Sequence, residues 1–485
     1  MIGVDAAEIS YLREHISDLP NFRQAFERGA LINLSSEAAL IPGSVWPSFF
    51  TESPPGEHGF YLILAWDSAA MRLRRVTADW LPMEPFWRDL ARQGFDVIAV
   101  DVPMIGTAPD GPGIEIAGWG THDGLSSFSV RPHKLASEIR RRFGAHPIGL
   151  EIPVEKTPAE RKRIMRKLID GARLKAELTK WLINTQRWDF LLVVFSELHR
   201  GGHILWPLGD SIDSEWLLEV YRAMDRALGE ILACLRLADT TVAIFALHGM
   251  GPNNSQEHFT QKIMARINSR FGAAEGSSTT SVPLRRFSPV SMLRERLPAR
   301  LQTAIALAVP QRIRDLVVDR TYTAGYDWRR TPAIALRSDR YGYIRLNIRG
   351  REREGMLEPG SPVLVKYIKE LCEGFVSFRT ELGQPLVEKI HFAPEIAPGT
   401  RTHLLPDIIV TWKNAPLASR IDSPLFGEII AQPDTGRTGH HRTQGFMIVL
   451  APEGQQSLSD TCEMSIENVG SLIRSRLSTG PSTAA

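Results

Sequence analysis

Cysteine is scarce in this sequence: the 485 residues include three, far apart in the chain, at Cys234, Cys372 and Cys462. Such a set excludes a disulfide framework or a zinc site built from thiolates, and it favours reduced thiols in a cytoplasmic protein. The sequence also lacks an apolar run long enough to span a bilayer, and its start lacks the pattern of a signal peptide. We therefore expect a cytoplasmic protein without membrane contact.

An excess of charge of one sign is missing as well. The 57 basic and 55 acidic residues give a net charge of +2, which predicts neither a nucleic-acid-binding surface nor an acidic tail. Residues 160–175 form a local basic run at helical spacing, which is typical of a solvated helix face. A hydrophobic content of 43% is enough for a large core, in one α/β domain with insertions or in two or three ordinary domains.

Short runs rich in Val, Ile, Leu and Phe alternate with longer amphipathic segments. Near-continuous apolar runs between helices are typical of strands buried on both faces, so we expect a mostly parallel sheet covered by helices. The runs lie at residues 1–5, 30–36, 95–103, 189–197, 241–249, 407–412 and 445–453. Residues 214–237 place their apolar side chains on one stripe and predict a helix ahead of a strand.

Changes in composition indicate how the chain is divided. Residues 272–282 are rich in Gly, Ser and Thr, which predicts a loop, and a basic, partly helical section follows them. We expect an interrupted core, an insertion and a tail. The expected parts are 1–275 for the first part of the core, 276–335 for an insertion or cap, 336–475 for the second part of the core, and 476–485 for a disordered tail.

Polar residues with metal-binding side chains stand at the ends of several expected strands. Ligands of a parallel α/β sheet bind outside the carboxyl ends of its strands. Asp5, the pair His199 and His203, and His248 all follow such ends. His441 instead precedes a strand, so it must approach the others through its loop.

The spacing of His199 and His203 is informative. Residues four apart lie on one face of a helical turn, about 6 Å apart, which suits two imidazoles that bind one metal ion. A lone pair of this kind is more often two exposed or capping histidines at a helix start. Gly201 and Gly202, which permit close backbone approach, and the buried strand ahead of the pair favour the metal site.

Five segments, taken in chain order, resemble the type I phosphodiesterase and nucleotide pyrophosphatase branch of the alkaline phosphatase superfamily. They are Asp5, residues 44–60 (SVWPSFFTESPPGEHGF), 196–203 (SELHRGGH), 247–253 (LHGMGPN) and 440–453 (HHRTQGFMIVLAPE). The resemblance implies an α/β fold: an alkaline-phosphatase-like three-layer α/β/α core with a mostly parallel sheet and an inserted cap segment. It also implies a metal-dependent hydrolase of small-molecule phosphate esters, with phosphodiesters preferred over monoesters.

The resemblance further implies roles for individual residues. Asp5, His203 and His441 match metal ligands, while His199 stands where relatives carry an aspartate and His440 is an alternative to His441. His248 matches the histidine of an Asp-His pair whose aspartate is replaced here by Leu247. Ser44 is expected to be the nucleophile and a metal ligand. Ser48 is the alternative, because counting back from PGEHG without a gap puts Pro42 at the nucleophile position.

These replacements leave Asp5 as the single aspartate among the matched metal positions. Two divalent ions would then be poorly compensated in a buried site, which is costly. His199, His203 and His441 fit one zinc ion with an open coordination position, and imidazole ligands favour zinc over magnesium. A second ion at Asp5, Ser44 and His248 should bind more weakly. His122 and Asp123, in the glycine-rich loop 118–124, are further candidates for lining the site.

Three functional hypotheses remain open from the sequence. The first is the phosphodiesterase, with attack on phosphorus by Ser44 or, if one ion is missing, by a zinc-bound hydroxide. The second is a phosphotransferase or sulfatase on the same fold, although the C/S-x-P-x-R motif of sulfatases is absent. The third is a catalytically silent binding or assembly protein that kept the fold and lost a metal site.

Overall fold

The largest sheet of the protein contains nine strands in the order β20-β2-β19-β9-β1-β8-β5-β6-β7. The computed structural model describes residues 1–77, 81–125, 127–149, 156–207, 215–274, 309–433, 436–452 and 462–478. The strands are β1 (Ile2–Val4), β2 (Ala30–Ser35), β5 (Val97–Val100), β6 (Ile114–Ala117), β7 (Ser129–Arg131), β8 (Phe190–Phe195), β9 (Val242–Ala246), β19 (Gly445–Leu450) and β20 (Cys462–Ser465). Most neighbours are parallel, but β19 runs antiparallel to both β2 and β9, and β7 runs antiparallel to β6.

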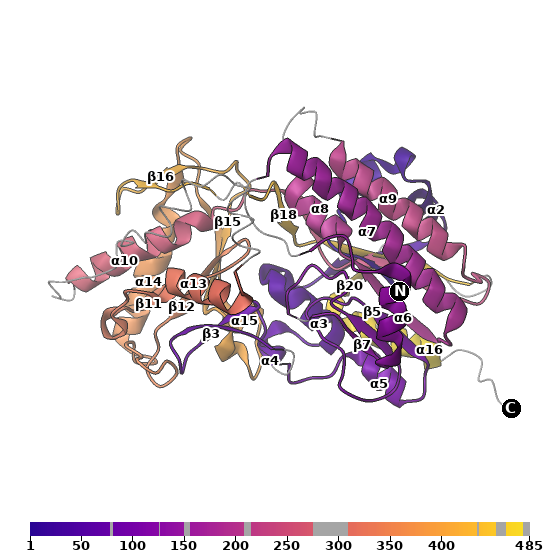
Figure 1. The fold of residues 1–485 in the computed structure, drawn as a ribbon. Helices are drawn as coiled ribbons and strands as arrows, with labels where there is room; N and C mark the ends of the chain where they lie inside the picture. Colours follow the sequence, from indigo (N-terminus) through magenta and orange to yellow (C-terminus); the bar gives the residue numbers. More distant parts are fainter. Residues whose placement is uncertain are drawn as a thin grey trace.

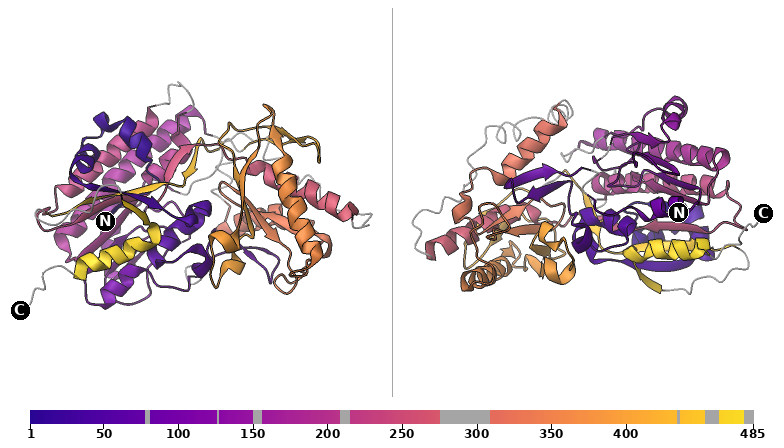
Figure 2. Two further views of the ribbon diagram at one scale, coloured as in Figure 1. Left: turned by 180° about the vertical axis from the view of Figure 1, so that it is seen from behind. Right: turned by 90° about the horizontal axis from the view of Figure 1, so that it is seen from below.

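Helices cover both faces of this sheet, which gives the expected three layers (Figures 1 and 2). One face carries α2 (Pro20–Arg28), α6 (Lys134–Phe143), α7 (Pro158–Thr185), α8 (Glu197–Leu205) and α9 (Trp216–Leu232), and the other carries α3 (Val45–Thr51), α5 (Phe86–Arg92) and α16 (Val469–Ser478). In β8, Val193 and Phe195 belong to the first face and Leu192 and Val194 to the second, because side chains alternate along a strand. The mostly parallel, doubly covered sheet is therefore confirmed.

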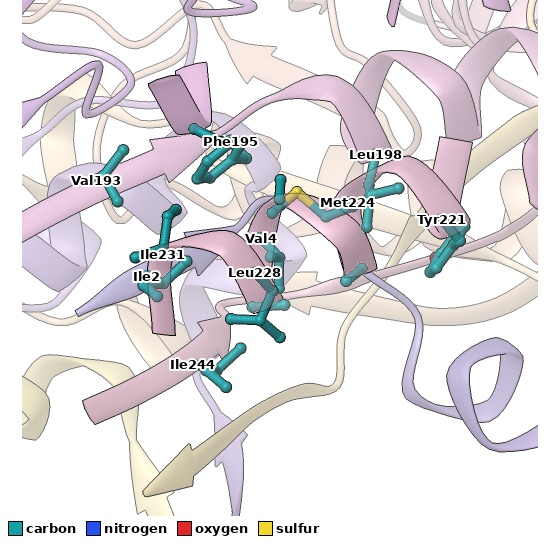
Figure 3. Packing of buried hydrophobic residues seen from close by; sticks show 14 of the residues in the cluster. Ile2, Val4, Val193, Phe195, Leu198, Tyr221, Met224, Leu228, Ile231 and Ile244 are labelled. Atoms are coloured by element: carbon teal, nitrogen blue, oxygen red, sulfur yellow. The ribbon is translucent and has the colours of Figure 1, made fainter. Parts of the chain in front are cut away.

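The helix expected within residues 214–237 is present as α9. Its apolar stripe packs on β1 and β8 (Figure 3), and Met224 and Leu228 are fully buried there. Truncating such a side chain to alanine costs about 2–5 kcal/mol. Helix α7 begins with a capping box in which Thr157 and Glu160 satisfy each other's backbone N–H groups.

A second lobe lies beside the first and has its own hydrophobic core (Figure 1). Its antiparallel sheet contains β11 (Ala333–Leu336), β12 (Gly342–Leu346), β15 (Ile408–Trp412) and β14 (Val387–Phe392), in that order. Helices α10 (Thr260–Ala274), α13 (Gln311–Thr323) and α14 (Pro362–Ser377) pack in this lobe. The expectation that residues 407–412 join the parallel sheet is wrong. A fully apolar run indicates burial on both faces, and it does not give the direction of the neighbouring strands.

Shorter elements complete the fold. They are α1 (Ile9–Glu14), α4 (Pro55–His58), α15 (Ala393–Ile396), β3 (Leu64–Asp67), β4 (Arg72–Arg75), β10 (Gly249–Pro252), β13 (Arg379–Thr380), β16 (Arg420–Asp422), β17 (Ile429–Ile430) and β18 (Gly439–Arg442). Residues 276–308 of the expected insertion lie outside the described residues, and α13 packs against β4. Helix α16 includes the first three residues of the expected tail. Within the described chain, no helix is both long and apolar enough to cross a bilayer.

Candidate functional site

The candidate residues meet at one edge of the large sheet. Asp5 follows β1, His199 follows β8 on helix α8, and His248 follows β9, so parallel strands deliver all three to the same edge. Strand β19 runs in the opposite direction, and its first residues therefore lie at this edge as well. The preceding strand β18, paired with β10, brings His441 to the others.

Three histidines converge most closely. His199, His203 and His441 are buried, and one ring nitrogen of each lies within 4.8 Å of those of the other two. His203 Nδ1 donates a hydrogen bond to the Gly439 carbonyl at 3.0 Å, which leaves its lone pair on Nε2. That Nε2 atom is buried and has no hydrogen-bond partner among the described residues. An imidazole oriented by a backbone carbonyl, with its other nitrogen free, is typical of a metal ligand.

Asp5, His199 and His248 form a second group whose ligand atoms also lie within 4.8 Å of one another. Asp5 Oδ2 is 2.9 Å from His199 Nδ1, and Asp5 Oδ1 accepts a hydrogen bond from Trp46 Nε1 at 3.0 Å. His248 Nε2 is 3.7 Å from Asp5 Oδ1. Asp5 is fully buried, so this carboxylate provides the site with a negative charge shielded from solvent.

The electrostatics of the site favour uncharged imidazoles at His199, His203 and His441, whereas the pKa of His122 is raised, because the Asp5 carboxylate outweighs the effect of burial. Burial lowers the pKa of His199 to about 4 and holds the pKa values of His203 and His441 well below the usual range. Burial alone would raise the pKa of Asp5, but its interactions with His199 and His122 outweigh this effect, and the pKa lies well below its usual range. Neutral imidazole and ionised carboxylate are the forms that bind metals, so the donor set fits zinc.

Two glycines allow helix α8 and strand β18 to touch. A Cβ added at Gly439 would lie closer than 3.0 Å to the Gly202 carbonyl oxygen, and one added at Gly202 would clash with the Met250 side chain. The close backbone approach expected for the glycines between His199 and His203 is therefore present at Gly202. This close approach of Gly202 and Gly439 sets the distance between His203 and β18.

The two candidate serines have different surroundings. Ser44 lies directly before α3, is buried, and donates a hydrogen bond from Oγ to the Ile41 carbonyl at 2.7 Å. Ser48 Oγ lies 2.9 Å from His58 Nε2, and His58 Nδ1 accepts a hydrogen bond from the Phe60 N–H. Burial lowers the pKa of His58 to about 3, so this histidine is neutral and carries its proton on Nε2. It therefore donates to Ser48 and cannot act as its base.

The remaining candidates also differ in placement. His122 lies against Asp5 and His199, whereas the Asp123 carboxylate accepts hydrogen bonds from the Met104 and Leu125 N–H groups. His440 Nδ1 accepts a hydrogen bond from the His441 N–H, and its ring lines a polar cavity of about 160 Å³. His440 belongs to neither group of converging ligand atoms in the described chain.

A buried ion pair lies beside the site, and no sequence pattern indicated it. Lys175 and Asp101 are fully buried, and Lys175 Nζ is 2.9 Å from Asp101 Oδ2. The expectation of a solvated face over residues 160–175 is thus wrong at Lys175, because α7 turns this position towards the sheet. Asp101 accepts hydrogen bonds from the Trp119 and Gly120 N–H groups, so the pair holds the loop that carries His122.

Comparisons with known proteins give a family and a fold. The sequence profile of the type I phosphodiesterase / nucleotide pyrophosphatase family matches residues 1–326, whereas the motifs extend to about residue 452. No match was found among curated proteins. The structure of phosphonoacetate hydrolase from Sinorhizobium meliloti, in complex with phosphonoformate, is similar, with 13% identity, a TM-score of 0.51, and coverage of 98% of this chain and 95% of that chain. An inactive variant of murine ectonucleotide pyrophosphatase / phosphodiesterase 5, in complex with AMP, has 10% identity, a TM-score of 0.48, and coverage of 98% and 94%.

Proposed function

We propose, on the premise that this chain belongs to the type I phosphodiesterase / nucleotide pyrophosphatase family and has an alkaline-phosphatase-like fold, that it is a zinc-dependent hydrolase of small phosphodiesters. The observation that carries the proposal is the convergence of three buried, uncharged imidazoles at the ligand-binding edge of the sheet. Zinc held by His199, His203 and His441 supplies Lewis acidity that stabilises negative charge on phosphoryl oxygens. Imidazole donors favour zinc over magnesium or calcium.

The protein's own residues prepare this site for an anionic substrate. Gly439 fixes the ring of His203 so that its Nε2 points away from the backbone, and Trp46 fixes the carboxylate of Asp5. Because the histidines are buried, water is largely excluded and electrostatic interactions with a phosphoryl group are strong. The polar cavity beside His440 is the space that we assign to a compact part of the leaving group, since about 160 Å³ is small for a whole ligand.

Ser44 is the nucleophile in the covalent version of the mechanism. Its Oγ forms a bond to phosphorus while the bond from phosphorus to the leaving group breaks, and the hydroxyl proton passes to the leaving-group oxygen. A water molecule then cleaves the phosphoserine. Ser44 supports this role better than Ser48, because the hydroxyl of Ser48 accepts a hydrogen bond from neutral His58.

A second candidate function is a catalytically silent binding protein on the same fold. Leu247, which is buried and apolar, favours this candidate because it stands where the family pattern has a metal-binding aspartate. The two candidates predict different metal contents.

The experiment compares metal content and turnover of the purified full chain. We expect bound zinc, turnover of bis-p-nitrophenyl phosphate well above that of p-nitrophenyl phosphate, and no turnover of p-nitrophenyl sulfate. His203→Ala should lower kcat/KM by about 100-fold or more. His133→Ala is the matched control, since His133 is exposed at the start of α6. A metal-free protein inert towards all three substrates would refute the enzyme and support the binding protein.

Ser44→Ala separates the two routes of attack. If Ser44 is the nucleophile, this variant loses diester turnover while it retains zinc. Unchanged turnover would eliminate the covalent route and leave direct attack by water.

A further inference from the structure

The two groups of metal-binding side chains share one member. His199 belongs both to the group with His203 and His441 and to the group with Asp5 and His248. A neutral imidazole has one nitrogen lone pair, so it binds one ion and not two. If His199 binds the ion held with His203 and His441, the second group keeps only Asp5 and His248. A second ion then needs another ligand.

His122 is the further metal-binding side chain beside Asp5 and His199, although it belongs to neither group of converging ligand atoms in the described chain. Its ring stacks on the ring of His199, with centroids 3.8 Å apart and an interplanar angle of 18°. Its Nδ1 is 3.1 Å from Asp5 Oδ2, close to the 2.9 Å between His199 Nδ1 and the same oxygen. Two ligand atoms bound tetrahedrally to one zinc ion lie about 3.3 Å apart.

The atoms around this point lack hydrogen-bond partners. Asp5 Oδ2, His122 Nδ1 and His199 Nδ1 are buried, and beyond their close contacts with one another they make no hydrogen bond with any described residue. His248 Nδ1 hydrogen-bonds to the Gly249 carbonyl at 3.2 Å, which leaves the Nε2 lone pair on the side of Asp5. Two imidazoles that share one carboxylate oxygen leave buried hydrogen-bonding capacity unused, which is costly, and a cation between these atoms would use it.

We propose that His122 is a ligand of a second zinc ion, together with Asp5 and His248, while His199 serves the first ion. This proposal rests on the proposed function and extends it. His122 comes from the loop 118–124, outside the segments that carry the family resemblance. It supplies a neutral ligand where the family pattern has carboxylates, so the second site is held with a single negative charge.

The loop is fixed in a way that a ligand requires. Asp101 binds the N–H groups of Trp119 and Gly120, Lys175 neutralises Asp101, and Arg200 on α8 donates to the Thr121 carbonyl. Three successive residues ahead of His122 are therefore held by charged side chains that are buried against the sheet. Ligands must be held to within a fraction of an ångström, and supporting hydrogen bonds of this kind provide that precision.

The test measures zinc per chain in the full-length protein after dialysis against a weak chelator. We expect two zinc ions in the wild type and one in His122→Ala, which keeps the three-histidine site. The exposed His133→Ala serves as the control and should keep two. If His122→Ala keeps two ions at unchanged affinity, or if the wild type binds one, the proposal is overturned while the proposed function stands. A wild type without zinc or turnover refutes the proposed function itself.

A second variant separates ligation from an ordinary ion pair. His122→Asp replaces the imidazole by a carboxylate, which binds zinc but repels Asp5. If position 122 is a ligand, His122→Asp should retain the second ion, and zinc should raise the melting temperature of this variant more than that of His122→Ala. If position 122 only pairs with Asp5, zinc gives equal shifts in both variants, which would contradict the proposal.

Discussion

Replacing Lys175 with methionine tests whether the buried pair with Asp101 stabilises the core beside the site. The two side chains are fully buried, and Lys175 Nζ also donates to the Val194 carbonyl at 2.9 Å. Methionine keeps most of the volume of the lysine stem but removes its charge. The substitution therefore leaves the buried Asp101 carboxyl group without a counter-charge.

The expected loss follows from the geometry of the pair. At 2.9 Å and an effective dielectric constant of about 20, the attraction is about 6 kcal/mol, and part of it is offset by the desolvation of both ions. Breaking one partner of a buried pair costs about 3–5 kcal/mol. Glu197 adds to the loss: burial tends to raise its pKa, and the charge of Lys175 is the largest influence that keeps this pKa lowered.

The assay is urea unfolding of the metal-free protein, with Lys180→Met as the control on the same helix. Lys180 and Glu230 form an exposed pair at 2.6 Å, with side chains 31% and 45% exposed, whose removal should cost less than about 1 kcal/mol. In Lys175→Met, the Trp119 and Gly120 amides should also exchange hydrogen faster, because the loop depends on Asp101. A Lys175→Met variant as stable as Lys180→Met would refute the reasoning.

Three further predictions concern residues around the site. In the folded protein the pKa of His58 is about 3, below its ordinary 6.5, so the unfolded chain binds a proton that the folded chain does not. The free energy of unfolding therefore falls as the pH drops below 6.5, by up to about 1.4 kcal/mol per pH unit. His58→Gln should lack this part of the pH dependence in urea unfolding at pH 7 and pH 5, and an equal pH dependence in both proteins would contradict the prediction. Gly439→Ala should lower zinc affinity by about 10–100-fold, because the new Cβ meets the Gly202 carbonyl. Gly149→Ala is the control and should keep the affinity, since a Cβ there has no atom within 4 Å. Isothermal titration measures both affinities, and equal values would argue against a fixed His203. Ser48→Ala should keep diester turnover within a few-fold of the wild type, because Ser48 pairs with His58; a loss as large as that of Ser44→Ala would return Ser48 to the nucleophile role.

Much of the large sheet and the main candidate ligands could be predicted from local sequence. Apolar runs such as 190–195 become strands because no polar side chain interrupts them, and a residue that follows a parallel strand lies at the ligand-binding edge. The placement of Asp5, His199 and His248 at this edge follows from the strands that precede them. Residues 407–412 show the limit, because the apolar pattern indicated burial but could not indicate which sheet would contain the strand.

The sequence by itself determined the types of candidate ligand and the strands that present them, since both depend on residue identity and short-range periodicity. Only the tertiary structure decided how distant segments meet. Strand β19 turned out antiparallel, which places its start, and with it His441, at the edge where β1, β8 and β9 end. The rotation of α7 that buries Lys175, and the docking of the loop that sets His122 against Asp5, depend on packing between segments far apart in the chain. No local pattern encodes such contacts.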